Sequence, residues 1–66
     1  MIINVNGKSS EYSGPPVLSE LLRSLGIDPK KVAVERNLRV VPRSGMECEP
    51  VESGDRFEII RLVGGG

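Results

Sequence analysis

The sequence predicts an α+β fold, a roll in which a four- or five-stranded mixed sheet packs on one helix. Apolar residues alternate along the first residues and again near the end of the chain, which indicates strands in both places. Between them, one stretch repeats leucine at helical spacing. Because a single amphipathic helix cannot bury its apolar face alone, we expect it to cover one face of the sheet.

The first two strands are predicted to form a hairpin. Met1, Ile3 and Val5 recur at every second position, as in a strand with one face directed inward. Asn6-Gly7 follows at once and favours a two-residue turn, because both turn positions need a positive φ. Residues 8–12 return antiparallel and are mostly polar, so we expect them to form an edge strand.

A helix is predicted after Ser13-Gly14-Pro15-Pro16. Pro16 suits the first helical turn, where its missing N–H is not needed. Gly26 suits the position just after the helix, and Ile27 can then contact Leu22 in a Schellman arrangement. The apolar stripe comprises four leucines with i, i+3, i+4 and i+7 spacing: Leu18, Leu21, Leu22 and Leu25.

The second half of the chain supplies the remaining strands. Val32 and Val34 alternate in a third strand, and Pro42 restricts the next strand at Val40-Val41 to a short or edge position. Residues 43–51 are predicted to be irregular, and residues 56–63 to form the last strand. The first and last strands are the most apolar, so we expect them to be central and adjacent. The expected core comprises Ile3, Val5, Leu21, Leu22, Phe57 and Ile59.

The composition restricts the possible classes of function. Nine Lys and Arg balance nine Asp and Glu, whereas binding nucleic-acid phosphates requires a basic excess. No apolar run approaches the roughly 20 residues of a membrane span. One cysteine and no histidine exclude an internal disulfide and a Cys/His zinc site. We expect one cytoplasmic domain over residues 1–66, with no bound metal or cofactor and no nucleic-acid or membrane partner.

The sequence contains no arrangement of residues typical of an enzyme active site. Without histidine there is no Cys–His or Ser–His pair, and the glycines do not form a phosphate-binding loop between a strand and a helix. Cys48 lies between two glutamates, whose charges disfavour a reactive thiolate, so we interpret it as structural. A cluster of acids is more typical of a solvated surface than of a general acid pair: Glu47, Glu49, Glu52 and Asp55. We therefore expect no catalytic residues in this chain.

The sequence Val63-Gly64-Gly65-Gly66 is the strongest functional signal. Glycine loses more conformational freedom on ordering than any other residue, so Gly64, Gly65 and Gly66 do not serve stability. Because these residues lack Cβ atoms, they can enter a channel too narrow for side chains and present the carboxylate of Gly66 to a partner. We expect residues 63–66 to form a flexible tail.

Residues beside the tail are candidates for a docking surface. Ile60 and Leu62 alternate with Phe57 and Ile59, so one of the two pairs faces away from the helix and forms an exposed apolar patch. Four arginines recur in the second half, either as a docking patch or as ordinary surface charge: Arg36, Arg39, Arg43 and Arg61. The candidate docking surface comprises Ile60, Leu62, Arg61 and Arg43.

Segments along the whole chain resemble the ThiS family. They are Ile2-Ile3-Asn4-Val5-Asn6-Gly7, Val17-Leu18-Ser19-Glu20-Leu21-Leu22 with Leu25-Gly26, Val32-Ala33-Val34-Glu35-Arg36-Asn37, Val41-Pro42-Arg43, and Gly54-Asp55-Arg56-Phe57-Glu58-Ile59 leading to Val63-Gly64-Gly65-Gly66. Two features depart from the family pattern. Pro15-Pro16 stands where a Thr or Ser usually caps the helix, and Met46 or Cys48 stands where a larger residue is frequent.

The resemblance implies a ubiquitin-like β-grasp fold and the role of a sulfur carrier in thiamine biosynthesis. A ThiF-type adenylyltransferase would use ATP and Mg²⁺ to convert the Gly66 carboxylate to an acyl adenylate. A persulfide, supplied indirectly by a cysteine desulfurase or another donor, would replace AMP and leave a thiocarboxylate. The tail would then enter the thiazole synthase ThiG and donate its sulfur to the thiazole moiety of thiamine. The catalytic residues would belong to these partners.

Three alternatives remain open from the sequence. A MoaD-like carrier would use the same chemistry at Gly66 but give its sulfur to molybdopterin. A ubiquitin-like protein modifier would join Gly66 to a lysine through an isopeptide bond. A plain binding domain would carry the glycines without using them.

Overall fold

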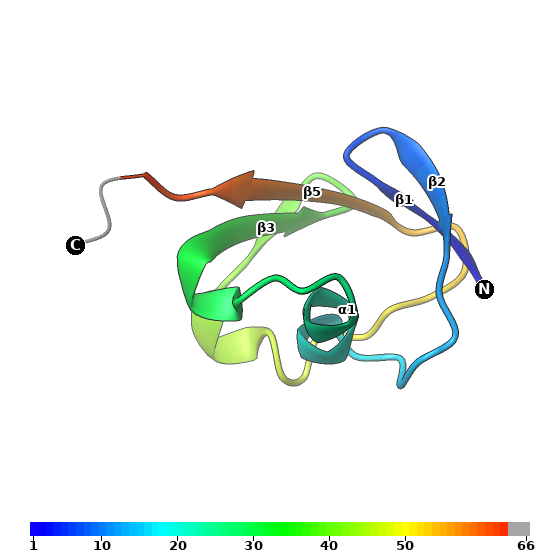
Figure 1. Ribbon diagram of the computed structural model, residues 1–66, viewed down its shortest axis with the longest axis horizontal. Coiled ribbons are helices and arrows are strands. Elements are labelled where there is room, and N and C mark those ends of the chain that lie inside the picture. The colour runs from blue at the N-terminus through cyan, green and yellow to red at the C-terminus, as the bar shows by residue number, and fades with distance from the viewer. Residues whose placement is uncertain (64–66) are drawn as a thin grey trace.

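The computed structural model describes residues 1–63, so most of the tail expected at residues 63–66 lies outside the described part. Five strands form one mixed sheet in the order β2-β1-β5-β3-β4. The helix α1 (Leu18–Ser24) lies across one face of this sheet (Figure 1). The predicted α+β roll is confirmed, with five strands.

The strands β1 (Ile2–Val5) and β2 (Lys8–Glu11) form the predicted hairpin. Asn6 and Gly7 connect them with φ angles of 50° and 84°, as the Asn-Gly pair predicts. Strand β2 is an edge strand of the sheet, also as predicted.

Strand β5 (Arg56–Arg61) lies at the centre of the sheet. It runs parallel to β1 and antiparallel to β3 (Val32–Arg36), which confirms that the first and last strands are adjacent. Strand β4 (Arg39–Val41) pairs with β3 at the other edge. The strand β5 ends two residues before the predicted limit, because the chain facing it becomes a 3₁₀ helix at Pro29–Lys31 and offers no further strand.

The helix α1 is shorter than the leucine pattern predicts. It begins after Val17, so the prediction that Pro16 occupies its first turn is wrong. Its C-terminal end is as predicted: Gly26 has a φ of 73°, and the N–H of Ile27 donates to the carbonyl of Leu22 over 2.9 Å. Leu25 is the C-cap residue just after α1 and is 44% exposed, so the prediction that it belongs to the buried stripe is also wrong.

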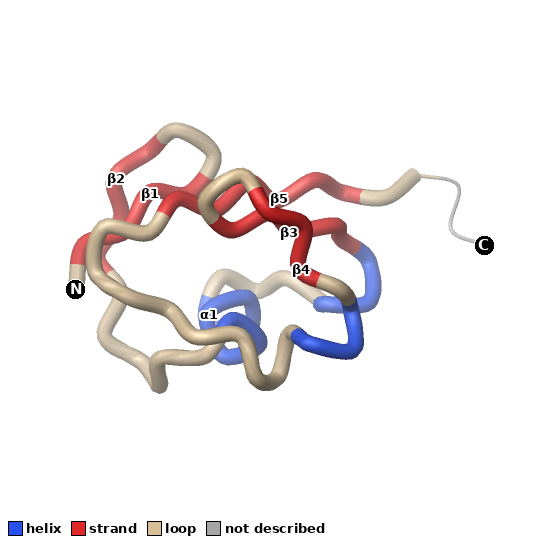
Figure 2. The backbone as a smooth tube through the Cα atoms, turned by 180° about the vertical axis from the view of Figure 1, so that it is seen from behind, coloured by secondary structure: helices blue, strands red, loops and turns tan. Residues whose placement is uncertain are grey.

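The loop before β5 supplies the N-terminal cap that the Pro-Pro sequence lacks. The N–H groups of Leu18 and Ser19 donate to the carbonyls of Glu49 and Met46, over 2.8 and 3.0 Å. A helix leaves its first N–H groups without intrahelical partners, and here a distant loop satisfies two of them. The loop therefore runs alongside α1 before it reaches β5 (Figure 2).

The core lies between α1 and the sheet, as predicted, but it is larger than the sequence indicates. Val5 and Ile59 are only partly buried, at its edge. Met46 and Val51, in the segment predicted to be irregular, are buried against α1 and the sheet. The buried cluster comprises Ile3, Tyr12, Leu18, Leu21, Leu22, Val32, Val34, Val41, Met46, Val51 and Phe57.

Candidate functional site

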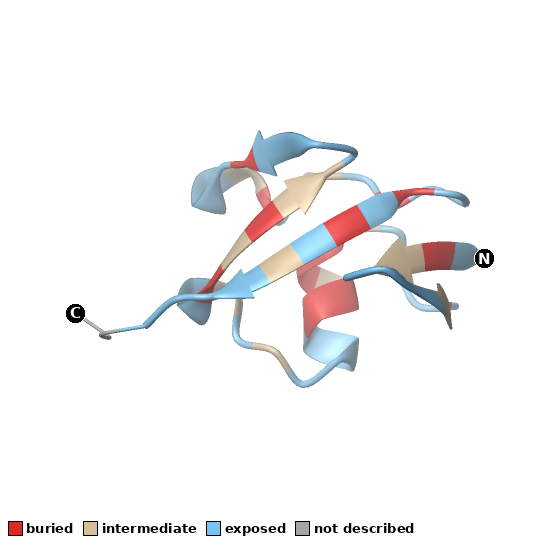
Figure 3. Cartoon of the chain, turned by 90° about the horizontal axis from the view of Figure 1, so that it is seen from above, coloured by how far each residue is buried: buried red, intermediate tan, exposed pale blue. Residues whose placement is uncertain are grey.

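Strand β5 carries the chain toward the tail with one face buried and the other exposed. Phe57 is fully buried and Ile59 is partly buried against the core. Ile60 and Leu62 are 55% and 47% exposed. Buried and exposed residues alternate accordingly along the ribbon of β5 (Figure 3). Ile60 and Leu62, the pair that the sequence assigns to the exposed apolar patch, are thus both exposed.

Ile60 is part of the sheet face opposite the helix. Its cross-strand neighbour on β3 is Ala33, and side chains of directly paired residues lie on the same face. Val40, on the edge strand β4, is a further exposed apolar residue. An exposed apolar surface near the end of β5 is typical of a protein-binding region.

Arg61 and Arg43 lie on a different surface from Ile60. Arg61 pairs with the buried residue Val32, so its side chain is on the helix side of the sheet. There a groove of about 920 Å³ forms between the end of β5, the end of α1 and the 3₁₀ helix. Its lining includes four basic residues and one acidic residue: Lys30, Lys31, Arg43, Arg61 and Asp28.

The candidate docking residues thus occupy two adjoining surfaces. Leu62 and Val63 contribute apolar atoms to the basic groove, whereas Ile60 faces the outer side of the sheet. The candidate docking surface inferred from the sequence does not include Lys30 and Lys31, which also line this groove. Their position could have been predicted from the sequence, because they immediately precede the strand that pairs with β5. They therefore lie beside the end of β5.

Arg36 and Arg39 do not belong to this basic region. Arg36 pairs with Phe57, near the start of β5 and away from Arg61, and Arg39 lies opposite Arg36 on β4. Of the four arginines, some of which could form a patch near the tail, the structure brings together Arg43 and Arg61.

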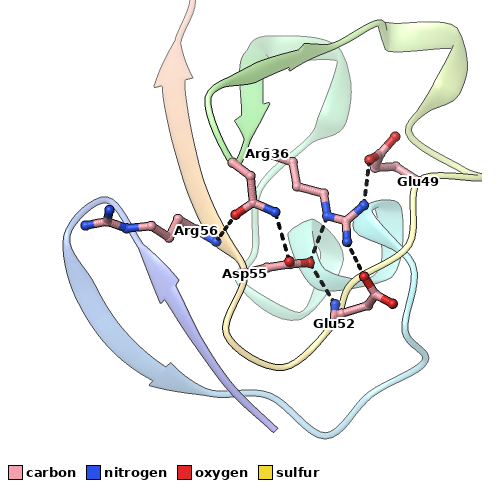
Figure 4. A network of polar contacts seen from close by, with 6 residues as sticks. Arg36, Glu49, Glu52, Asp55 and Arg56 are labelled. Atoms are coloured by element: carbon pink, nitrogen blue, oxygen red, sulfur yellow. Dashed lines mark hydrogen bonds and ion pairs between the residues drawn. The ribbon is translucent and has the colours of Figure 1, made fainter.

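Arg36 is instead the centre of a polar network (Figure 4). Its Nε donates to Asp55 Oδ2 over 2.8 Å, and its two terminal nitrogens donate to Glu49 and Glu52 over 3.1 and 2.7 Å. The hydrogen bond to Asp55 contributes most to raising the pKa of Arg36 above its ordinary value. The interpretation of these acids as a solvated surface is wrong for Asp55, which is buried, and for Glu49, which is half-buried.

Asp55 accepts further hydrogen bonds. Asn37 Nδ2 donates to its Oδ1 over 3.0 Å, and the N–H of Glu52 donates to its Oδ2 over 2.8 Å. Burial alone would raise the pKa of Asp55, but the hydrogen bonds from Arg36, Asn37 and Glu52 hold it below its usual value. The network joins the end of β3 to the start of β5 and has the character of a structural anchor.

Other chemical groups provide no second site in residues 1–63. Cys48 is exposed and free, and its N–H donates to the carbonyl of Gly45 over 3.0 Å. The described residues contain no group of three or more His, Cys, Asp or Glu that could hold a metal ion. No helix among them is long and apolar enough to cross a membrane. Gly64, Gly65 and Gly66 lie outside the described residues.

Comparison with known proteins identifies the family. The ThiS family model matches residues 3–66. The crystal structure of the thiamine biosynthesis protein (ThiS) from Geobacter metallireducens has a TM-score of 0.85 and 35% sequence identity, and the match covers 100% of both chains. The predicted ubiquitin-like β-grasp fold is therefore confirmed.

Two further relatives differ in how much of their own length this chain covers. A thiazole synthase of Paramagnetospirillum magneticum is 42% identical over 66 residues, which are 100% of this chain and 20% of that protein. The chain thus spans about a fifth of the length of the thiazole synthases it matches. The uncharacterized protein ycf40 of Porphyra purpurea is 33% identical over 64 residues, which cover 97% of this chain and 90% of that protein. The family match and the structural likeness over the full length show that this chain belongs to the ThiS family.

Proposed function

We propose that this chain is a sulfur carrier protein of thiamine biosynthesis and that the Gly66 carboxylate is its carrier group. The observation that carries this proposal is the family match over residues 3–66, which includes the three terminal glycines. The fold supports it as well, because the end of β5 extends away from the body of the protein (Figure 1).

The first step must activate the carboxylate of Gly66. A carboxylate is a poor electrophile, since its negative charge repels nucleophiles and oxide is a very poor leaving group. In our proposal a ThiF-type adenylyltransferase uses ATP and Mg²⁺ to form the acyl adenylate and release pyrophosphate. ATP and Mg²⁺ act in the partner, so this chain needs no cofactor of its own.

The second step places sulfur on Gly66. The terminal sulfur of a persulfide, derived from a cysteine desulfurase or another donor, attacks the acyl carbon, and AMP leaves with the bonding electron pair. The acyl group is then joined to the donor through a disulfide. A thiol of the donor system cleaves that disulfide, which is reduced as the thiol is oxidised, and releases the thiocarboxylate.

The third step transfers the sulfur to a thiazole synthase of the ThiG type. The sequence similarity to polypeptides named thiazole synthase supports this choice of acceptor. Both partner enzymes contribute the catalytic residues, and this chain acts as their shared substrate in the cytoplasm. We propose that they contact Ile60 on β5, Leu62 just after this strand, and the basic groove at Arg43 and Arg61.

Intact-mass spectrometry tests the proposal. The purified chain is incubated with a ThiF-type enzyme, Mg²⁺ and a persulfide donor, with and without ATP. We expect an ATP-dependent mass gain that corresponds to one oxygen replaced by sulfur, located on Gly66 by fragmentation. Absence of the acyl adenylate and of the thiocarboxylate would contradict the proposal.

The product in the native host separates the alternative functions. A ladder of lysine conjugates would indicate a protein modifier. Transfer of the sulfur to a molybdopterin precursor, with none to thiazole, would indicate a MoaD-like carrier.

A further inference from the structure

The backbone of β5 has two hydrogen-bonding edges, and only one of them is occupied near the tail. The N–H of Leu62 donates to the carbonyl of Lys31 over 2.9 Å, and Arg61 lies directly opposite Val32. In an antiparallel pair, successive residues direct their N–H and C=O groups alternately toward and away from the partner strand. The backbone groups of Arg61 therefore point away from β3, toward the side on which β1 lies.

On that side, β1 and Asn6 occupy the edge of β5 only as far as Ile59. The N–H of Asn4 donates to the carbonyl of Asp55, and the N–H of Asn6 donates to that of Phe57, over 2.8 and 2.9 Å. The side chain of Asn6 then accepts from the N–H of Ile59 over 2.7 Å and donates to its carbonyl over 3.2 Å. The side chain of Asn6 thus takes the place of one further residue of β1 in pairing with β5.

Beyond Asn6 the first strand leaves the sheet. The chain reverses at Gly7 into the edge strand β2, so the end of β5 projects past the hairpin (Figures 1 and 3). Within residues 1–63, the backbone N–H and C=O of Arg61 have no hydrogen-bond partner. Such an open strand edge is a template for another extended backbone.

The side chains around this edge indicate what kind of segment fits. Ile60 and Leu62 are exposed and apolar, and they lie on either side of Arg61 along the strand. Arg61 itself faces the basic groove with Lys30, Lys31 and Arg43. A complementary segment would therefore place apolar side chains beside Ile60 and Leu62 and an acidic side chain beside Arg61.

We propose that an extended, partly acidic segment of the thiazole synthase pairs with the free edge of β5 at Arg61 and continues the sheet into that enzyme. This strand addition uses backbone hydrogen bonds for affinity and the alternating side chains for selectivity. It also fixes the direction in which the tail leaves β5. The inference rests on the proposed function, since it takes the thiazole synthase as the partner.

A proline substitution tests the backbone pairing. Arg61→Pro removes the N–H and places a ring at the edge, whereas Arg61→Ala removes the side chain alone. Because β3 does not use the N–H of Arg61, the proline variant should retain the fold, as prolines do on free strand edges. We expect Arg61→Pro to bind the thiazole synthase about tenfold more weakly than Arg61→Ala, given the lost hydrogen bond and the added steric hindrance. Equal affinities would overturn the proposal.

Amide hydrogen exchange gives a second test that needs no variant. In the free chain, the N–H of Arg61 should exchange faster than those of Ile60 and Leu62, although all three lie at the end of a central strand. On adding the thiazole synthase, the exchange at Arg61 should slow markedly. Unchanged exchange at Arg61 in the complex would overturn the proposal, even if the proline variant failed to fold.

Two further outcomes show whether the strand addition or the proposed function is wrong. If the wild-type chain gains sulfur on Gly66 but the edge variants bind alike, the strand addition is wrong and the carrier function stands. If the wild-type chain gains no sulfur, the proposed function itself fails. Sedimentation of the free chain is the remaining control, because a dimer abolished by Arg61→Pro would make a second copy the occupant and overturn the assignment to the enzyme.

Discussion

Arg36, at the end of β3, donates through Nε to the buried carboxylate of Asp55 over 2.8 Å. Asp55 immediately precedes β5, so this ion pair joins the two neighbouring strands at the end of the sheet opposite the tail. It also holds the loop that caps α1, because Glu49 and Glu52 bind the same guanidinium. The network thereby sets where β5 begins.

Asp55→Asn should lower the free energy of unfolding by about 1–3 kcal/mol at neutral pH, because it removes the charge from a buried hydrogen-bonded pair. The pKa of Asp55 is lower in the folded than in the unfolded chain. Its stabilisation is therefore fully present above about pH 4 and is lost as the pH falls through the folded-state pKa. Urea unfolding of the wild-type chain and of Asp55→Asn from pH 7 to pH 2 should show that the difference between their free energies of unfolding decreases below about pH 4.

Glu52→Gln provides the control for this network. Glu52 also binds Arg36, but its side chain is largely exposed, so the substitution should cost less than about 1 kcal/mol. A larger loss at Glu52 than at Asp55 would contradict the view that the buried carboxylate is the anchor.

Leu22→Ala should destabilise the protein by about 2–5 kcal/mol, because it leaves a cavity in the core. Leu22 is fully buried on α1, whereas Leu25, the C-cap residue of that helix, is 44% exposed. Leu25→Ala should therefore shift the melting temperature much less than Leu22→Ala does. Similar shifts for the two variants would mean that the observed end of the buried stripe is wrong.

Ile60→Asp should weaken binding to a ThiF-type enzyme at least about tenfold, as expected for a charge introduced into the apolar part of an interface. Leu38→Asp is the matched control: Leu38 is 88% exposed but lies in the turn at the other end of β5. Calorimetric titration of both variants with the enzyme should give a weaker affinity for Ile60→Asp than for Leu38→Asp. Equal weakening would show that Ile60 has no special part in docking.

Cys48→Ser should leave sulfur loading unchanged. The thiol is exposed and free, and the proposed chemistry places the sulfur on the carboxylate of Gly66 and not on a thiol of this chain. The rate of thiocarboxylate formation, followed by mass spectrometry, checks this. A variant that folds normally but gains no sulfur would assign Cys48 a role in the transfer.

Local signals predict those parts of the fold that depend on one or two residues. Asn6-Gly7 and Gly26 each require a positive φ, and the structure has it at all three residues. The alternation on β5 likewise predicts that Phe57 and Ile60 lie on opposite faces of the sheet, and Phe57 is buried whereas Ile60 is exposed.

Long-range contacts account for what the sequence does not reveal. Met46 and Val51 are buried because their loop lies along α1, and no periodic pattern marks an irregular segment. The acids that bind Arg36 are 13 to 19 positions away from it, and their spacing alone does not indicate a common partner. The edge at Arg61 becomes visible only when the register of β5 on both sides is known.

The central claim is that function resides in the carboxylate of Gly66 and in the thinness of the residues before it. Adding one alanine after Gly66 moves the carboxylate by up to about 3.6 Å. Adenylation requires the reacting atoms to lie about 3–3.5 Å apart in the correct orientation. Gly65→Val leaves the position of the carboxylate in the chain unchanged but adds a branched side chain beside it.

ATP–pyrophosphate exchange with a ThiF-type enzyme is the most direct test of this claim. The wild-type chain should support exchange, whereas the alanine-extended chain and Gly65→Val should both lose it while melting at the wild-type temperature. The melting temperature controls for folding, since Phe57 is the last buried core residue along the described part of the chain. Wild-type exchange by the extended chain, with its extra alanine still present by mass, would contradict the account.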